Sequence, residues 1–553
     1  MPHAISMAST GLQALILCGP GSSFPTFTSN PDENPKALLP IANRPMVWYP
    51  IDFCYRAGIS TKAIKTGLNT DVSLTSLPLP RPDILAPREL DYNMGTAEIL
   101  RLPEVRDLVT SDFVVLPCDL ICELGGEKLL QAWQVKSASL SEMLEADIYS
   151  DSNPGRSSGG LGVWYDAKAN TPIKKEETDF ISTAPIDDDG SSPGPRDSLI
   201  PKLSNLVFSM PTDSLKEVTE ERKGLPLRYS LMRGNARLRM LTTHRDAHIY
   251  IFPRWIIDFV VENERLESIS EDVVGWWAKA GWQPGLAEKL HMKRVCGPPQ
   301  HDEARQSSSP TSDEAPAELD VFKFMEGFSK PPFSVELDSN RSSFPQFYRD
   351  EEESATTRVP PILAYVHAGA DQKAGSLIRR VDTAQLLLAI SLELAKLPSL
   401  EETGAADATS PSSPSPYAHP RKIAYPEGVK SRTTITKQDT LVGDNVKVEE
   451  KVSVKESVVG NGCQLNEGAK LSQCLLMEGV VVGKHCKLTK CILGKRCVIG
   501  DGSVLTNCEV QENLLVEAKT DDKDNKLMSS EGLEATEAEM EEVLQEQEEV
   551  MAE

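Results

Sequence analysis

The residues best placed to do chemistry form a glycine-rich loop near the N-terminus. An apolar run over residues 12–18 predicts a strand, which delivers the loop Gly19-Pro20-Gly21-Ser22-Ser23 at its carboxyl end. In open α/β sheets, ligands bind beside that end of the strands. The backbone N–H groups of a glycine-rich loop can hold phosphate groups. The sequence therefore predicts a ligand site at this loop.

Three further segments, taken with the loop, carry a family resemblance. The run NPKALLPIANRPM occupies residues 34–46, GTA occupies residues 95–97, and FVVLPCD occupies residues 113–119. In this order they resemble the opening signature, the nucleobase loop and the metal-binding strand of the sugar-phosphate nucleotidyltransferases. The segment HIYIF at residues 248–252 is similar to a later strand of that family. The resemblance covers roughly residues 10–290.

The resemblance implies a nucleotide pocket with defined roles. In such a pocket the glycine-rich loop holds phosphates, cations offset charge at the attacked phosphorus, and carboxylates hold Mg²⁺. The implied nucleotide-binding residues are Gly19, Gly21, Lys36, Gly95 and Thr96, and the implied metal ligand is Asp119. Taken without the resemblance, Lys36 can equally be a solvated loop lysine, Asp119 a turn or helix-cap residue, and GTA only the start of a helix.

The chain departs from the family where catalysis needs a cation. The family pattern places Thr-Arg after the second glycine, whereas this chain has Ser22-Ser23. A serine hydroxyl cannot supply the fixed bidentate charge of a guanidinium, and loss of a catalytic arginine costs on the order of 10³-fold or more in phosphoryl transfer. We therefore expect no catalytic residue and no required cofactor. A residual nucleotide or Mg²⁺ in the pocket stays open.

Other chemistries have weaker sequence support. The chain lacks the G-x-x-x-x-G-K-[ST] run of P-loop proteins. His244 and His248 have a spacing that suits zinc only on a helix, and the alternation after them favours a strand. His485 is a candidate for acyl transfer in a repeat domain, but it lies inside a hexad without a long extruded loop. We expect no zinc binding, and acyl transfer stays as a third hypothesis.

Two kinds of element must position these residues. Over residues 10–296, short apolar runs alternate with amphipathic ones, as is typical of strands and helices around a mostly parallel sheet. From residue 441 to 516 aliphatic residues recur every 17 positions, in columns 6, 6 and 5 residues apart, which predicts a triangular coil. The predicted fold class is α/β, a nucleotidyltransferase-like Rossmann-type domain followed by a left-handed parallel β-helix of hexapeptide repeats. The three columns are Val442, Val459, Leu476, Leu493 and Val510; Val448, Leu465, Val482, Ile499 and Val516; and Val454, Leu471, Leu488 and Leu505.

Glycines and cysteines also follow the repeat. Gly460, Gly483, Gly494 and Gly500 each follow a column residue, and we expect them to form tight corners with positive φ. Cysteines recur at residues 474, 491 and 508, and at 463 and 497 in another column. Small side chains stacked inside the coil explain these thiols better than a metal site or a disulfide ladder does.

Composition divides the rest of the chain. Segments rich in Ser, Pro and Asp at residues 151–196, 297–318 and 401–420 predict linkers or surface loops. Apolar spacing predicts a helix near residues 377–397. The predicted domains are an α/β domain at 10–296, a connecting region with disordered insertions at 297–420, the β-helix at 421–520 and an acidic tail at 521–553.

Charge and hydropathy limit the partners. The net charge is −24 and the pI is about 4.9, so direct nucleic-acid binding is not expected. No secretory signal and no run of about 20 apolar residues is visible, so we expect no membrane contact and a cytosolic location.

The two predicted domains together indicate the branch of the family. This pairing is found in sugar-nucleotide pyrophosphorylases and in the gamma and epsilon subunits of the exchange factor for eukaryotic initiation factor two. The substituted loop favours the second group. The chain is more similar to gamma, because epsilon continues into a large helical domain after its β-helix. This resemblance implies a non-catalytic subunit that pairs with epsilon and other subunits and helps to exchange GDP for GTP on the initiation factor. An active pyrophosphorylase is the alternative.

Overall fold

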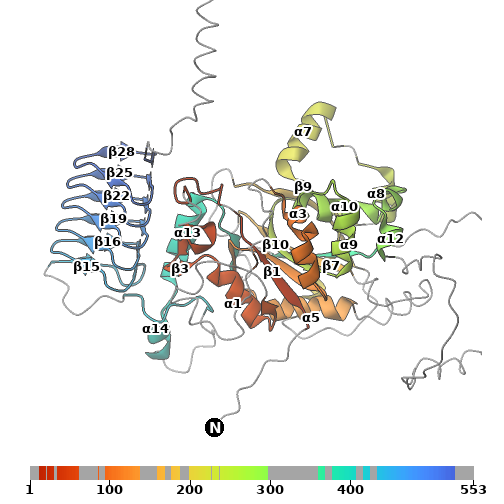
Figure 1. The fold of residues 1–553 in the computed structure, drawn as a ribbon, viewed down its shortest axis with the longest axis horizontal. Helices are drawn as coiled ribbons and strands as arrows, with labels where there is room; N and C mark the ends of the chain where they lie inside the picture. Colours follow the sequence, from red (N-terminus) through yellow and green to blue (C-terminus); the bar gives the residue numbers. More distant parts are fainter. Residues whose placement is uncertain are drawn as a thin grey trace, which may run out of the picture.

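The computed structural model describes residues 11–19, 21–29, 34–61, 85, 94–137, 159–168, 176–186, 198–225, 227–235, 237–296, 359–367, 376–405, 415–423 and 432–529. An α/β domain and a stack of β coils lie next to each other along the longest axis (Figure 1). Within the described ranges, every helix is too short or too polar to cross a bilayer.

One mixed sheet of eight strands forms the centre of the α/β domain, in the order β4-β1-β5-β10-β7-β11-β9-β8. The first three strands in this order are parallel, β10 is antiparallel to both its neighbours, and β11 is parallel to β7. The strands are β1 (Gln13–Leu17), β4 (Ser60–Thr61), β5 (Phe113–Pro117), β7 (Gly160–Asp166), β8 (Asp179–Pro185), β9 (Leu203–Pro211), β10 (Arg239–Phe252) and β11 (Ile362–His367). Two small pairs accompany it, β2 (Pro40–Ile41) with β3 (Arg44–Pro45), and β6 (Leu120–Cys122) with β12 (Ile378–Arg380).

Helices cover both faces of this sheet. Ala14 and Ile16 of β1 belong to one core and Leu15 to the other, because successive side chains of a strand point to opposite faces. The first core is closed by α1 (Trp48–Arg56), α5 (Gly126–Ser137) and α13 (Ala384–Lys396). The second is closed by α3 (Thr96–Arg101), α4 (Pro103–Leu108), α9 (Trp255–Glu262), α10 (Val274–Ala280), α11 (Leu286–Lys289) and α12 (Met292–Cys296). The remaining helices are α7 (Thr212–Arg222), α8 (Tyr229–Gly234) and α14 (Leu400–Ala405).

Two of the predicted linkers contain structural elements. The segment 151–196 holds β7 and β8, and β7 pairs with both β10 and β11 inside the main sheet. The segment 401–420 holds most of α14 and the buried residue Tyr417, whose hydroxyl donates to the Cys122 carbonyl at 2.6 Å. The prediction of linkers was wrong here, because burial in the sheet and core overrides a polar average composition. Residues 297–318 lie outside the described residues.

The connecting region predicted at 297–420 also contributes to the α/β domain. Strand β11 inserts between β7 and β9. The helix predicted near 377–397 is α13, which begins at Ala384, with Thr383 as its N-cap accepting from the Leu386 amide. Residues before it form β12 instead, because Ile378 pairs with Cys122 of β6. Leu377 and Val381 fit a helical spacing but are buried beside this strand pair.

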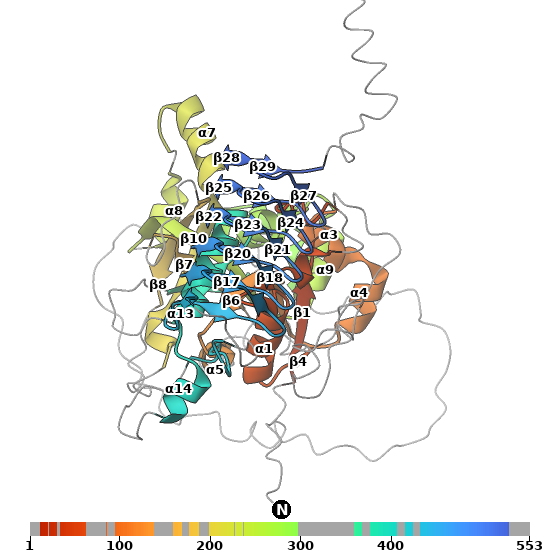
Figure 2. The ribbon, with the colours of Figure 1, turned by 90° about the vertical axis from the view of Figure 1, so that its left-hand side faces the viewer.

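Three parallel sheets run along the β-helix, and they confirm the predicted register. The pairs Val442 with Val459, Val448 with Leu465, and Val454 with Leu471 each open one of the predicted columns. Figure 2 shows the coils stacked one above another. The stack continues beyond the predicted end at 520. Its strands are β13 (Thr434–Ile435), β14 (Leu441–Val442), β15 (Lys447–Val448), β16 (Ser453–Lys455), β17 (Val458–Val459), β18 (Gln464–Leu465), β19 (Lys470–Ser472), β20 (Leu475–Leu476), β21 (Val481–Val482), β22 (Lys487–Thr489), β23 (Ile492–Leu493), β24 (Val498–Ile499), β25 (Val504–Thr506), β26 (Glu509–Val510), β27 (Leu515–Val516), β28 (Asp521–Lys523) and β29 (Lys526–Leu527).

The four glycines of the repeat are required for a different reason from the one predicted. None of them has a positive φ. A Cβ at Gly460 would lie 2.7 Å from the Met477 carbonyl carbon, and one at Gly494 would lie 2.6 Å from the Glu512 amide nitrogen. Close approach of the next coil therefore excludes a side chain. Positive φ occurs elsewhere in the coils, for example at Asn445 and Asn513.

The cysteines of the repeat are buried inside the coil, as their spacing predicts. The Cys491 thiol donates to the Leu505 carbonyl of the following coil at 3.3 Å. Each of these thiols is free rather than bonded to another sulfur. Their burial fits stacking of small side chains.

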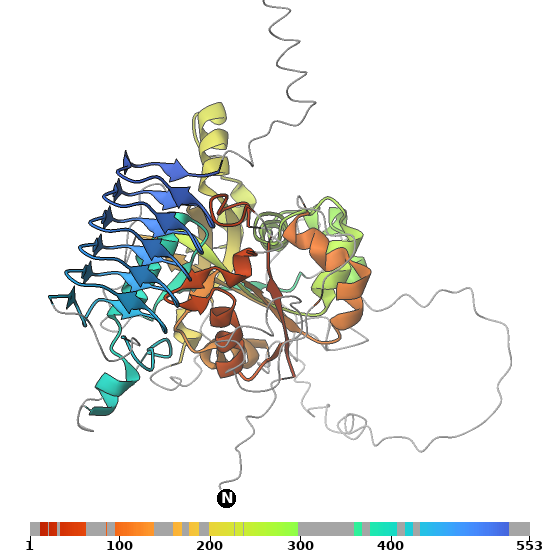
Figure 3. The same ribbon diagram turned by 60° about the vertical axis from the view of Figure 1, so that its left-hand side comes forward.

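The β-helix packs against the α/β domain through α13 and the β2–β3 hairpin. Leu441, Val458 and Leu475 stand in one outward-facing row of the coils and belong to the same core as α13. Asn43 of the hairpin donates to the Val459 carbonyl at 2.9 Å. Figure 3 shows α13 enclosed between the coils and the sheet. The two units therefore share one apolar interface.

Candidate functional site

The glycine-rich loop leaves β1 as predicted, but its own side chains fold it into a closed turn. The Thr28 hydroxyl donates to the Gly21 carbonyl at 2.7 Å, and Gly21 has a φ of +98°. A Cβ at Gly21 would lie 2.8 Å from the Thr28 hydroxyl oxygen, so the turn requires glycine. Phe24 and Phe27 are each only 1% exposed. The loop is thus filled with aromatic side chains, while Ser22 is exposed at its tip.

The same loop is tied to the β-helix. The Thr26 hydroxyl donates to the Glu509 carboxylate at 3.0 Å, and Asn34 donates its side-chain amide to Glu512. Glu512 is 7% exposed, and it also accepts from the Ser29 hydroxyl at 3.4 Å. Hydrogen bonds to buried charged groups contribute about 1.5–3 kcal/mol each. The predicted phosphate loop therefore forms part of the contact between the two domains.

Lys36 and Asp119, both predicted for the pocket, lie in direct contact. The Lys36 ammonium is 2.8 Å from one oxygen of Asp119, and the Arg380 guanidinium is 3.3 Å from the other oxygen. The carboxylate side chain is 2% exposed. Asp119 follows β5, Arg380 ends β12, and the 3₁₀ turn Lys36–Leu38 follows the glycine-rich loop. Three distant segments therefore build one buried ion cluster.

This cluster fixes the charge of Asp119. Burial alone raises the pKa of a carboxyl group, but the charges of Arg380 and Lys36 outweigh it and hold the Asp119 pKa well below its usual range. Burial alone lowers the pKa of Arg380, but the combined attraction of Asp119, Asp382 and Tyr165 outweighs it and raises that pKa. Asp119 is an anion whose two oxygens both face cations. Any metal ion at Asp119 has to displace these partners.

Gly95 and Thr96 serve the start of a helix. Gly95 is the N-cap of α3, and its amide donates to the Glu98 carboxylate at 2.7 Å. The Thr96 hydroxyl accepts from the Ile269 amide at 2.9 Å. A Cβ at Gly95 would lie 2.2 Å from the Glu267 carbonyl oxygen, so the helix start packs directly on residues 267–269. Within the described residues, the hydrogen bonds of this pair include those to Glu98, Ile99 and Ile269, and none of these partners is Lys36 or Asp119.

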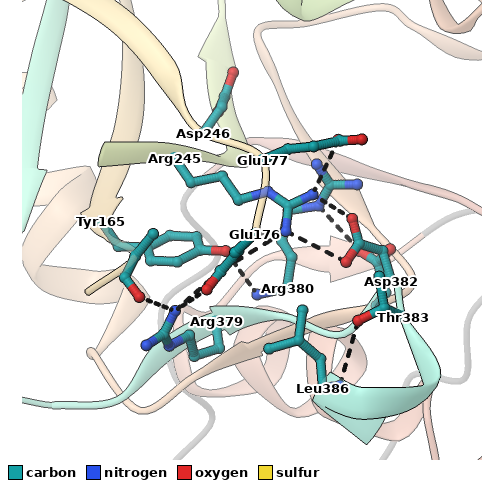
Figure 4. A network of polar contacts seen from close by, with 12 residues as sticks. Tyr165, Glu176, Glu177, Arg245, Asp246, Arg379, Arg380, Asp382, Thr383 and Leu386 are labelled. Atoms are coloured by element: carbon teal, nitrogen blue, oxygen red, sulfur yellow. Dashed lines mark hydrogen bonds and ion pairs between the residues drawn. The ribbon is translucent and has the colours of Figure 1, made fainter. Parts of the chain in front are cut away.

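A polar cavity of about 290 Å³ opens beside the ion cluster. Its lining includes Arg380 and Asp382, which are two positions apart along the chain, together with Asp179, Arg245 and Asp246. The Arg245 guanidinium makes two contacts with Asp382, one of them at 3.3 Å (Figure 4). The basic groups of this cavity are therefore already paired with carboxylates.

A second buried ion pair lies beneath this cavity. Arg379 is 1% exposed and contacts both oxygens of Glu176, at 3.0 Å and 3.1 Å (Figure 4). The same guanidinium donates to the Ala167 carbonyl at 2.9 Å. Both contacts to Glu176 come from one nitrogen, Nη1, and such charge-assisted hydrogen bonds hold the two side chains in place. The pair therefore fixes the end of β7 against β12.

Asp246 is the carboxyl group of this cavity that stays protonated most easily. Burial, followed by the charge of Asp179, raises the pKa of Asp246 to about 7. Its oxygens accept from the His248 amide at 2.8 Å and from the Tyr250 hydroxyl. His248 has a φ of +52° where the pairing of β10 with β7 shifts register. The bulge turns the backbone so that Asp246 is enclosed.

The three histidines considered from the sequence lie in a strand and at a coil corner. His244 and His248 both belong to strand β10, and burial lowers the pKa of each. His485 is exposed at a coil corner with a φ of +57°. Among the described residues, no group of three or more His, Cys, Asp or Glu side chains could hold a metal ion.

The sequence motifs do not identify the residues that form ion pairs in and around the predicted pocket. Arg379, Arg380 and Asp382 fall in the region predicted as a connector, and Glu176 falls in a predicted linker. One signal was available: two arginines and an aspartate interrupt an otherwise apolar run from Leu377 to Leu388. Charges inside an apolar run often have buried partners, since unpaired burial is costly.

Comparison with known proteins identifies one family in the β-helix and related full-length proteins. The family described as "EIF2B subunit epsilon LbH domain" matches residues 424–521. The "Translation initiation factor eIF2B subunit gamma" of Schizosaccharomyces pombe is 26% identical over 296 residues, covering 52% of this chain and 55% of its own length. The protein of the same name from Dictyostelium discoideum is 24% identical over 269 residues, 47% of this chain and 54% of its own length.

These matches agree with the branch that the sequence favours. The chain spans about half the length of the curated relatives it matches. Both relatives are gamma subunits, and the matched β-helix family is that of a subunit of the same factor. The resemblance read from the motifs is therefore confirmed: over about half of its length the chain is similar to the gamma subunit of translation initiation factor eIF2B.

Proposed function

We propose that this protein is a non-catalytic subunit of an eIF2B-type guanine-nucleotide exchange complex. In this proposal it pairs with an epsilon subunit and other subunits and helps to bind eukaryotic initiation factor two, so that GDP is exchanged for GTP. The nucleotidyltransferase-like domain acts as a rigid support rather than as an enzyme. It needs no cofactor, and it works in the cytosol without contacting nucleic acid or membrane.

The observation that carries the proposal is the pairing of Asp119 with two cations. A nucleotidyltransferase needs its lysine free for phosphate and its carboxylate free for Mg²⁺. Here Lys36 is held 2.8 Å from Asp119, and Arg380 occupies the other oxygen. The groups that would act on a nucleotide are used to hold the fold together.

The glycine-rich loop supports the same proposal. It carries Ser22-Ser23 where the resemblance calls for an arginine. It is also tied to Glu509 and Glu512 of the β-helix. A loop held by the neighbouring domain cannot wrap a triphosphate without breaking those contacts, which favours a structural role.

Co-purification from the source cells tests the proposal. A tagged copy of the full chain is expected to bring down an epsilon-type subunit and subunits of initiation factor two. The recovered complex should release labelled GDP from that factor faster than the same preparation depleted of the tagged chain. Recovery of the chain without any initiation-factor subunit contradicts the proposal.

The alternative is an active sugar-1-phosphate nucleotidyltransferase. One observation favours it: the predicted Lys36 and Asp119 meet at the carboxyl end of β1 and β5, where ligands of α/β sheets bind. An enzyme of this kind would have to release Asp119 from both cations when substrate binds. Direct assay of the reaction separates the two proposals.

A further inference from the structure

A second cavity lies outside the site described above. Its volume is about 260 Å³, and its walls come from β8, β9, α8 and α10. In Figure 1, α8 and α10 lie on the side of the α/β domain that faces away from the β-helix. The cavity shares no lining residue with the polar cavity beside Asp119.

Aromatic rings and one lysine form the floor of this cavity. The Lys279 ammonium lies 4.7 Å from the ring centroid of Phe208 and 4.7 Å from that of Trp276. Burial lowers the pKa of Lys279. The indole nitrogen of Trp282 donates to the Val207 carbonyl at 2.8 Å, which fixes this wall. A partly desolvated cation between two rings attracts an anion more strongly than a solvated lysine does.

The charge of the lining is entirely positive. Lys279 and Arg228 line the cavity, and none of its lining residues is Asp or Glu. Among the described residues, no ion pair includes Lys279. The chain as a whole carries a charge of −24, so a lining with two cations is a local exception, although Asp272 attracts Lys279 from outside the lining. The lining is complementary to an anion.

A buried hydroxyl points to a missing partner. Ser182 of β8 lines the cavity, is 1% exposed, and its hydroxyl has no hydrogen-bond partner among the described residues. Buried polar groups are nearly always satisfied, because an unmade hydrogen bond costs free energy. Rotation of the Ser182 side chain toward the cavity would let a polar atom of an occupant satisfy this hydroxyl.

The rim of the cavity exposes large apolar side chains. Leu227, Met240 and Trp276 are 47%, 39% and 38% exposed, and all three line the cavity. The adjoining helix α8 also exposes Tyr229 and Met232, at 79% and 51%. Exposed apolar surface around a pocket is typical of protein–protein contact sites. The volume is below the roughly 300–1,000 Å³ of small-molecule pockets, so it suits one bulky side chain.

We propose that this cavity, lined by Phe208, Leu227, Arg228, Trp276 and Lys279, is a docking site for an acidic segment of a partner protein. One aromatic or large aliphatic side chain of the segment enters the cavity. A neighbouring carboxylate of the segment pairs with Lys279, and Arg228 binds a second one at the rim. The site does not depend on the proposed exchange function.

Fluorine NMR on the full chain labelled with 5-fluorotryptophan tests the proposal. The chain has 7 tryptophans, so the signals of Trp276 and Trp282 can be assigned with single Trp→Phe variants. The probe is the synthetic peptide acetyl-Glu-Asp-Phe-Leu-Glu-Asp-amide. We expect it to shift both signals in a saturable manner. A peptide with lysine at every acidic position, and one with serine in place of Phe and Leu, should bind at least about tenfold more weakly.

Two matched variants locate the charge contact. Lys279→Gln is expected to weaken binding of the acidic peptide by about tenfold, while Lys289→Gln on exposed helix α11 leaves it unchanged. Unchanged melting temperatures show that both variants fold. The proposal is overturned if the peptide shifts neither signal at millimolar concentration, if the lysine peptide binds equally well, or if Lys279→Gln has no effect. Binding of N-acetylphenylalanine as tight as that of the peptide also overturns it, because a small acid would then suffice.

Discussion

Asp119 shows how the same residue types can serve chemistry or stability. Lys36, Arg380 and Asp119 would suit phosphate and metal binding if they were free, but Lys36 and Arg380 both form ion pairs with Asp119. Breaking a buried ion pair by removing one partner leaves an uncompensated charge, which costs about 3–5 kcal/mol. The cluster therefore stabilises the junction of β5, β12 and the glycine-rich loop.

Replacing Arg380 tests that stabilising role. Arg380→Met is expected to lower the free energy of unfolding by about 3–5 kcal/mol, because one oxygen of buried Asp119 loses its partner. The combined variant Arg380→Met with Asp119→Asn should cost less than the sum of the two single changes. Urea unfolding followed by circular dichroism measures both. Arg254→Met, which breaks an exposed pair with Asp258, serves as control and should cost under about 1 kcal/mol. Additive costs in the double variant would contradict the pairing.

Asp246 predicts a pH dependence of stability. Its pKa is raised to about 7 by burial, so the folded state keeps a proton that the unfolded state releases near pH 4. The contribution of Asp246 to the free energy of unfolding is therefore fully present below about pH 4. It falls by up to about 1.4 kcal/mol per pH unit as the pH rises toward 7, and it is lost above that pH. Asp246→Asn removes the charge and keeps one oxygen acceptor for the His248 amide, while its NH2 group can donate to the Tyr250 hydroxyl oxygen.

The measurement is the melting temperature from pH 5 to pH 8. The variant Asp246→Asn should gain stability over the wild type as the pH rises across this range. The exposed residue Asp213, replaced in the same way, provides the control and should leave the profile unchanged. Parallel pH profiles for the wild type and Asp246→Asn would show that the carboxyl group is already ionised at pH 5.

For single residues, the sequence predicts which ones belong to the pocket but not which charged groups they pair with. Lys36 and Asp119 could be identified from motifs, and the structure brings them together. Arg380 could not, because it follows Asp119 by 261 positions, and its approach depends on β12 pairing with β6. Whether a charged group is free or paired is decided by such long-range pairing.

Among the elements, the β-helix was the most predictable and the sheet the least. A coil contacts only its neighbours, so a 17-residue period fixes every pairing in the stack. The central strand β7 could not be read in the same way. Its residues are buried on both faces, but the turn-forming residues on either side give the segment 151–196 a polar average composition. β11 was missed for the same reason, since its place in the sheet depends on β7 and β9.

The register of the coil is tested by one pair of substitutions. Val482 is fully buried in the coil, whereas Val481 beside it is only partly buried. Val482→Asp buries an unpaired carboxylate and should make the protein insoluble or lower its melting temperature by more than about 4–8 °C, the shift expected for 1 kcal/mol in a small domain. Val481→Asp should have a much smaller effect. Equal effects of the two changes would refute the register.

The loop between β1 and α1 is tested at its contact with the β-helix. Glu512→Ala removes the carboxylate that accepts from Asn34 and Ser29. We expect faster protease cleavage within residues 21–34 and a loss of about 1–3 kcal/mol, because two polar groups lose their acceptor. Glu517→Ala, at an exposed position of the same coil, is the matched control. Identical cleavage rates for the two variants would mean that the loop does not depend on the β-helix.

The whole molecule combines two rigid units with one shared core. Apolar residues of the coils belong to the same core as α13, and the glycine-rich loop adds polar contacts to the same interface. A domain held in this way keeps a fixed orientation, which suits a part of a larger assembly. Helices α8 and α10 of the second cavity lie on the side that faces away from the coils, so a partner there leaves the interface untouched (Figure 1).

The central claim is that the nucleotidyltransferase-like domain no longer performs chemistry. The direct measurement is pyrophosphate release by the purified full chain with Mg²⁺, nucleoside triphosphates and hexose 1-phosphates, beside an active pyrophosphorylase. With Lys36 and Arg380 both bound to Asp119 and no arginine in the loop, we predict no release above the rate without protein. Turnover of about 1 s⁻¹ or more, within the usual range of enzymes, would contradict the account.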